Sequence, residues 1–149
     1  MADPFALETL NMQLSLTVEE LRECNYFTGP VGLRLSETEI RTLAAQRVAA
    51  LKETGRMEFG AGILKKLIQA FYDSPYLLQE NYEATLIELQ ESFYFFKNES
   101  NDLISDDDLI AFMRCTFDDV AQGSLDYLAS TSLQDLCKNA RQSRGGDYD

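Results

Sequence analysis

The sequence predicts a mainly α-helical protein, a compact bundle of about five to six helices. Three observations predict this class. Apolar residues recur at three- and four-residue spacing through most of the chain. A helix-start signal is repeated along it, and the 45% hydrophobic content of 149 residues is ordinary for one globular core. We therefore expect a single domain over residues 1–149, with a flexible tail at about 143–149.

The helix-start signal occurs at residues 16–21, 35–40 and 104–109. Each copy has an apolar residue, a Ser or Thr, an acid three residues later, and another apolar residue. The hydroxyl and the acid satisfy backbone N–H groups at a helix start, while the apolar pair packs together. Three helices are thus predicted to begin near Val18, Glu37 and Asp106.

Two segments ahead of these starts show a different period. Residues 10–16 (LNMQLSL) and 31–35 alternate apolar and polar side chains, which is typical of β-strands. Residues 25–30 (NYFTGP) would form the connecting turn. The sequence is therefore also compatible with a small β-pair near residues 10–16 and 31–35.

Stop and start residues place the other helices. Gly55 is a typical helix stop, Gly60-Ala61-Gly62 reads as a turn into a helix, and Ser74-Pro75 as a cap with a first helical position. The predicted helices are 37–52, 61–71, 75–96, 106–123 and 124–142, the last broken at 130–132.

The helix predicted over 75–96 ends in four consecutive aromatic residues, 93–96, so its end is apolar nearly all round. Such an end is either central in the core or docked against a second surface. Arg47 falls inside the apolar stripe of its own helix, which favours an internal ion pair and leaves a ligand-anchoring role as the alternative. If exposed, the candidate partner surface is Phe93, Tyr94, Phe95 and Arg47.

Composition excludes several functions. The net charge of −12 should repel nucleic acid and anionic membranes. The acidic segment 77–130 could attract a basic protein, fold onto the basic segment 34–72 of its own chain, or simply form a solvated face. The sequence has no histidine, which excludes Ser-His-Asp and Cys-His catalysis. Its three cysteines lack metal-site spacing, and it contains no signal-peptide pattern and no membrane-length apolar run. We expect a reduced, cytoplasmic protein without a cofactor.

Residues 89–113 resemble an EF-hand, a helix–loop–helix calcium motif. Aligned on its loop, residues 97–108 place Ile104 at the apolar position, but Lys97 at the first ligand position and Asp102 where glycine belongs. A cation there repels calcium, and a non-glycine residue there strains the backbone. Either the loop is an ordinary helix connection whose acids form a cap, or it is a weak calcium or magnesium site. The candidate ligands are Glu99, Asn101, Asp106, Asp107 and Asp108.

The chain as a whole resembles a bacterial family of small acidic proteins with no assigned function. The resemblance rests on residues 59–90 (FGAGILKKLIQAFYDSPYLLQENYEATLIELQ), on FYFFKNES at 93–100 and on DDDLI at 106–110, and extends over about 59–128. It implies a bacterial origin and transfers no catalytic or binding residue.

Three function hypotheses follow. The leading one is a non-enzymatic helical interaction or accessory protein, with a basic protein partner or a second copy of itself. The first alternative is a divalent-cation-linked switch that uses the loop 97–108. The second is an enzyme based on carboxylates alone, as in glycoside hydrolysis. None involves nucleic acid or a membrane.

Overall fold

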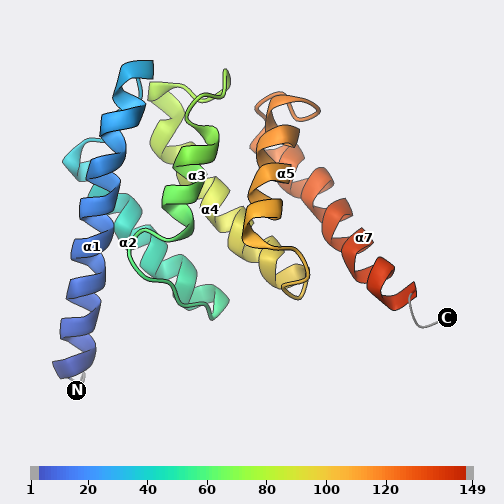
Figure 1. The fold of residues 1–149 in the computed structure, drawn as a ribbon, viewed down its shortest axis with the longest axis horizontal. Helices are drawn as coiled ribbons and strands as arrows, with labels where there is room; N and C mark the ends of the chain where they lie inside the picture. Colours follow the sequence, from blue (N-terminus) through green and yellow to red (C-terminus); the bar gives the residue numbers. More distant parts are fainter. Residues whose placement is uncertain (1–3, 147–149) are drawn as a thin grey trace.

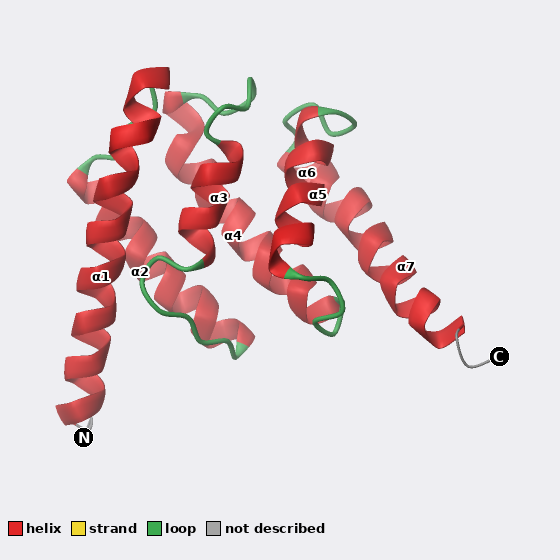
Figure 2. Cartoon of the chain, in the orientation of Figure 1, coloured by secondary structure: helices red, strands yellow, loops and turns green. Residues whose placement is uncertain are grey.

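A computed structural model describes residues 4–146, and these residues form helices and connecting loops without a strand (Figures 1 and 2). The mainly α-helical prediction is confirmed. The long helices are α1 (Pro4–Thr28), α2 (Glu37–Thr54), α3 (Ile63–Phe71), α4 (Tyr82–Glu99), α5 (Asp106–Asp118) and α7 (Leu133–Gly146). Short helical turns lie at η1 (Gly29–Val31), η2 (Gln79–Asn81), α6 (Leu125–Tyr127) and a π-helical turn, η3 (Leu128–Ser132).

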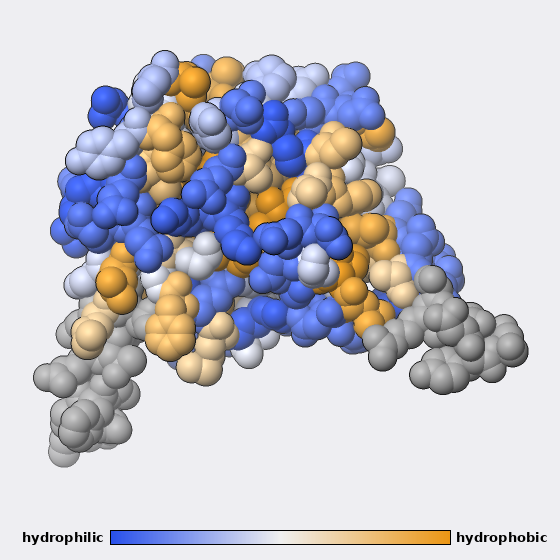
Figure 3. Space-filling view, viewed as in Figure 1, coloured by the Kyte–Doolittle hydropathy of each residue, from blue (hydrophilic) through white to orange (hydrophobic). Residues whose placement is uncertain are grey.

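Helix α4 is the centre of the bundle. It contacts α2, α3, α5 and α7, while α1 packs on α2 and α3 at one end of the molecule (Figure 1). Within α4, Leu86, Leu89 and Phe93 follow helical spacing and are buried. Hydrophilic side chains cover much of the face in Figure 3, and hydrophobic ones show between them at the centre and toward the lower right as well as at the lower left. The core therefore forms around α4.

Two of the three predicted helix starts are correct. Ser36 accepts a hydrogen bond from the backbone N–H of Glu39 and donates its own N–H to the Glu39 carboxylate, which starts α2 at Glu37. Ser105 likewise accepts from the N–H of Asp108 and starts α5 at Asp106. Gly55 ends α2 with a left-handed φ of 70°, as expected.

The predicted start near Val18 and the strand at 10–16 are wrong, because α1 runs without interruption from Pro4 to Thr28. Leu14, Val18 and Leu21 follow helical spacing and pack toward the core, which explains why the alternation ahead of them does not form a strand. The Thr17 hydroxyl caps no helix; it donates to the carbonyl of Gly60, 2.7 Å away in the α2–α3 loop.

The strand at 31–35 is also wrong, although its alternation is real: Leu33 and Leu35 are buried and Arg34 is exposed. Two amide side chains bind the backbone where a second strand would. Asn25 bonds the N–H and carbonyl of Leu35 at 2.9 and 3.0 Å, and Gln79 bonds those of Arg34 at 2.7 and 2.8 Å. An extended segment can thus satisfy the hydrogen-bonding groups of its backbone without joining a sheet.

Several helix ends differ from the prediction. The fourth helix begins at Tyr82 rather than Pro75, because Ser74 donates to the Asp118 carboxylate and a turn follows it. Helix α5 ends at Asp118 instead of Gly123. The break expected at 130–132 is present as the π-helical turn. Of the expected tail at 143–149, residues 143–146 continue α7, and 147–149 lie outside the described residues.

Candidate functional site

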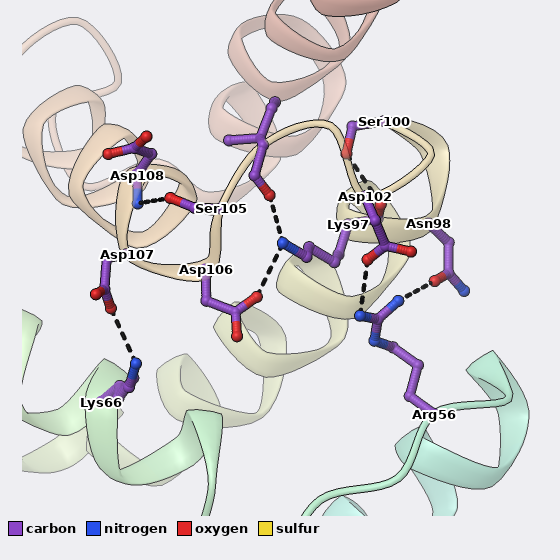
Figure 4. Close-up of polar contacts among 11 residues, drawn as sticks. Arg56, Lys66, Lys97, Asn98, Ser100, Asp102, Ser105, Asp106, Asp107 and Asp108 are labelled. Atoms are coloured by element: carbon purple, nitrogen blue, oxygen red, sulfur yellow. Dashed lines mark hydrogen bonds and ion pairs between the residues drawn. The ribbon is translucent and has the colours of Figure 1, made fainter.

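The loop between α4 and α5 holds a cation that belongs to the chain itself. Lys97 in the last turn of α4 is buried, and its ammonium group donates to the backbone carbonyl of Ile104 (Figure 4). The same ammonium pairs with the Asp106 carboxylate at 2.9 Å. Carbonyl and carboxylate oxygens are the groups that calcium would take in such a loop. The ammonium of Lys97 therefore occupies oxygens that a metal ion would need.

The backbone of this loop turns where the EF-hand comparison placed a glycine. Asn101 and Asp102 have left-handed φ values of 55° and 58°. Arg56, in the loop after α2, donates to the Asp102 carboxylate at 2.8 Å and to the Asn98 side chain at 2.6 Å (Figure 4). The hydrogen bond from Arg56 lowers the pKa of Asp102. These contacts hold a left-handed conformation that non-glycine residues adopt at a cost.

The structure does not gather the five candidate metal ligands. Asp106 pairs with Lys97 and Asp107 with Lys66 at 2.9 Å, while Glu99 lies 3.6 Å from Arg141. Asn101 and Asp108 are exposed. In Figure 4 the carboxylates of the α5 start point in different directions. Among the side chains that the structure describes, no group of three or more His, Cys, Asp or Glu residues is arranged to hold a metal ion.

The aromatic end of α4 is mostly interior, which corrects the proposed partner surface. Phe93, Tyr94 and Arg47 are each at most 1% exposed, so they cannot contact a partner from the surface of this fold. Phe95 alone of the four candidates is exposed, at 54%. It points away from the core because it lies opposite the buried stripe on the helix.

Arg47 forms the internal ion pair that its position in the sequence favours. Its guanidinium donates to the Glu58 carboxylate at 3.3 Å and to the backbone carbonyl of Ala61 at 3.1 Å. The Glu58 Oε1 atom also accepts from the Tyr94 hydroxyl at 2.5 Å and from the N–H of Ile63 at 3.1 Å. Burial and this bond to Glu58 raise the pKa of Tyr94. Sequence reasoning missed Glu58 because acids are abundant and only the tertiary fold selects one.

The Gly60-Ala61-Gly62 turn fits tightly over this cluster. Both glycines have left-handed φ values, and a Cβ on Gly62 would lie 2.2 Å from the Glu58 carboxylate. A Cβ on Gly60 would lie 2.3 Å from the carboxylate of Glu20, which also accepts the N–H of Ala61 at 2.8 Å. The turn into α3, predicted from these glycines, is therefore confirmed, and its role is packing.

A groove of about 700 Å³ lies beside Phe95, between α2, α4 and η3. Its apolar part comes from both helices and from the π-helical turn, and its polar part includes three glutamates. The apolar and aromatic residues that line it are Ala50, Tyr94, Phe95, Phe96 and Ala129. The glutamates are Glu53, Glu91 and Glu99. Sequence reasoning named Phe95 for a partner surface and Glu99 for a metal site, but it missed Glu53 and Glu91, because no spacing pattern joins α2 to α4.

No helix within residues 4–146 is both long enough and apolar enough to cross a membrane. No curated protein and no solved structure matches the chain. A family model covers residues 20–146, nearly the whole bundle, which confirms the expected resemblance to a family without assigned function. The chain belongs to DUF6323, a family of unknown function.

Proposed function

We propose that this chain is a non-enzymatic, helical protein-interaction module that holds another protein in the groove between α2 and α4. The main support for the proposal is the exposure of Phe95, a large aromatic side chain that is 54% exposed within a concave site. Aromatic residues that become covered on binding supply much of the energy of protein interfaces. Since its neighbours Phe93 and Tyr94 are buried, the core supports Phe95 rigidly.

The chemistry of the groove suits binding. Its polar side chains are carboxylates, hydroxyls and one amide, and they line the groove together with the exposed Phe95. Interfaces commonly combine an apolar centre with such a polar rim. The sequence contains no histidine, so the Ser-His and Cys-His pairs that activate nucleophiles are not available to it.

We also propose that the protein acts in the cytoplasm. Cys24, Cys115 and Cys137 are free cysteines, and Cys115 is exposed. Free thiols persist in reducing compartments, whereas oxidising ones favour disulfides.

Site-specific photo-crosslinking tests the proposal. A photoreactive phenylalanine analogue replaces Phe95 in the cells that make the protein. The matched control replaces Phe59, an exposed phenylalanine outside the groove lining. We expect one protein to be crosslinked from position 95 and not from position 59. The variant Phe95→Ser should lose the same protein in co-purification, and Phe59→Ser should retain it. No crosslink at position 95, or equal crosslinking at both positions, would contradict the proposal.

A further inference from the structure

We infer that the segment bound in the groove is a basic amphipathic α-helix of the partner protein. The inference rests on the proposed function and specifies the chemistry of what the groove accepts. Such a helix would lay its apolar face on Phe95 and direct lysine or arginine side chains to the rim. Helix-in-groove binding is a common mode of peptide recognition.

The charge of the groove lining favours a basic segment. The ionisable side chains that line the groove, apart from Tyr94, are the three acids Glu53, Glu91 and Glu99. The groove also runs along the C-terminal halves of two helices, since α2 ends at Thr54 and α4 at Glu99. Helix C-termini carry partial negative charge, which adds to that of the carboxylates. A cationic partner is therefore the complement of this site.

Most of this negative charge is not neutralised within the described part of the chain. Glu91 accepts a hydrogen bond from the uncharged amide of Gln46 at 2.5 Å. Among the side chains that the structure describes, none of the lysines and arginines pairs with Glu53 or Glu91. Glu99 lies 3.6 Å from Arg141, both about half exposed. The carboxylates of the groove could thus form ion pairs with a bound cation.

The shape of the groove favours a helical segment. Ala50, Ser92 and Ala129 are the small residues of its lining, and small side chains let a second helix come close. Phe95, on α4, is 54% exposed and supplies a large apolar anchor to the lining. A second copy of this chain fits less well, because two molecules of charge −12 repel each other.

Peptide titration tests the inference on the full chain. The probe is a synthetic helical peptide with leucines on one face and lysines on the other. One control peptide carries glutamates in place of the lysines, and a second has the lysine peptide's composition in scrambled order. Binding is followed by NMR chemical shifts of the labelled protein. We expect the basic amphipathic peptide to shift Phe95, Ala50 and Ala129, and neither control to do so. Its affinity should fall about tenfold as salt rises from about 50 to about 300 mM.

Matched variants separate the groove from the overall charge. Glu53→Gln, Glu91→Gln and Glu99→Gln combined should weaken peptide binding about tenfold. Glu23→Gln, Glu80→Gln and Asp119→Asn combined remove the same charge at exposed positions outside the groove and should change it less than about twofold. Phe95→Ser should weaken binding about tenfold or more.

The two proposals fail in different ways. If position 95 crosslinks a protein but the basic peptide does not bind, or the acidic or scrambled peptide binds equally well, the helix inference is overturned and the interaction function stands. Concentration-dependent dimerisation that Phe95→Ser abolishes would identify a second copy as the occupant and also overturn it. If both triple variants weaken peptide binding equally, only the net charge of the protein attracts the peptide, and the helix inference is overturned.

Discussion

Two loops of this protein close around a basic side chain from the helix that precedes them, and they do so in different surroundings. In the α2–α3 loop, Arg47 binds the backbone carbonyl of Ala61 and the carboxylate of Glu58. In the α4–α5 loop, Lys97 binds the carbonyl of Ile104 and the carboxylate of Asp106. Each cation thus bonds one loop carbonyl and one carboxylate. A buried cation is a second way, besides a metal ion, to organise a helix–loop–helix connection.

The two carboxylates differ in exposure. The Glu58 side chain is 18% exposed and is shared with Tyr94 and the start of α3, whereas the Asp106 side chain is 45% exposed. Ion pairs removed from water are strongly coupled to their surroundings, and exposed ones are screened. The same contact pattern should therefore contribute more to stability in the α2–α3 loop than in the α4–α5 loop.

The largest expected effect comes from Arg47→Met. Loss of the guanidinium leaves Glu58 mostly buried without its cation, which should lower the free energy of unfolding by about 3–5 kcal/mol. Urea denaturation followed by circular dichroism measures this. The double variant Arg47→Met with Glu58→Gln removes both charges and should recover part of the loss. A cost below about 1 kcal/mol for Arg47→Met would show that the buried pair adds little.

Lys97→Met should have a smaller effect, about 1–2 kcal/mol in the same measurement. The variant leaves the Ile104 carbonyl without this donor, but Asp106 remains half exposed to water, which limits the penalty. Lys66→Met is the matched control, because Lys66 pairs with Asp107 and both are exposed; it should cost less than about 0.5 kcal/mol. If Lys97→Met proves as costly as Arg47→Met, exposure is not what distinguishes the two loops.

The sequence predicted those parts of the fold whose signals are local. Ser36 and Ser105 cap helices through neighbours three residues away, and Gly55 ends a helix by its own conformation. The start expected near Val18 failed because the Thr17 hydroxyl bonds Gly60, far away in the chain. The strand at 31–35 failed because Asn25 and Gln79 bond the extended segment. Such long-range partners leave no mark in a local pattern.

In the candidate site, too, local features could be predicted from the sequence and long-range contacts could not. The sequence indicated that Lys97 disfavours a metal ion and that Arg47 needs an acid, since both follow from charge and helical position. It could not choose Glu58 or Asp106 among many acids, nor separate exposed Phe95 from its buried aromatic neighbours. Those choices depend on which helices pack against each face of α4.

The smallest expected effect is on calcium binding. Because the Lys97 ammonium already bonds the Ile104 carbonyl and the Asp106 carboxylate, we expect millimolar calcium or magnesium to leave the Tm of the natural protein unchanged relative to chelator. Lys97→Asp replaces the competing cation with a carboxylate and should make Tm respond to calcium, if the loop keeps its backbone path. A rise of several degrees in the natural protein would show that an ion can displace Lys97 from these oxygens. The loop with the more exposed carboxylate would then be a cation-linked switch, and the α2–α3 loop, with Glu58 mostly buried, should remain unaffected by the ion.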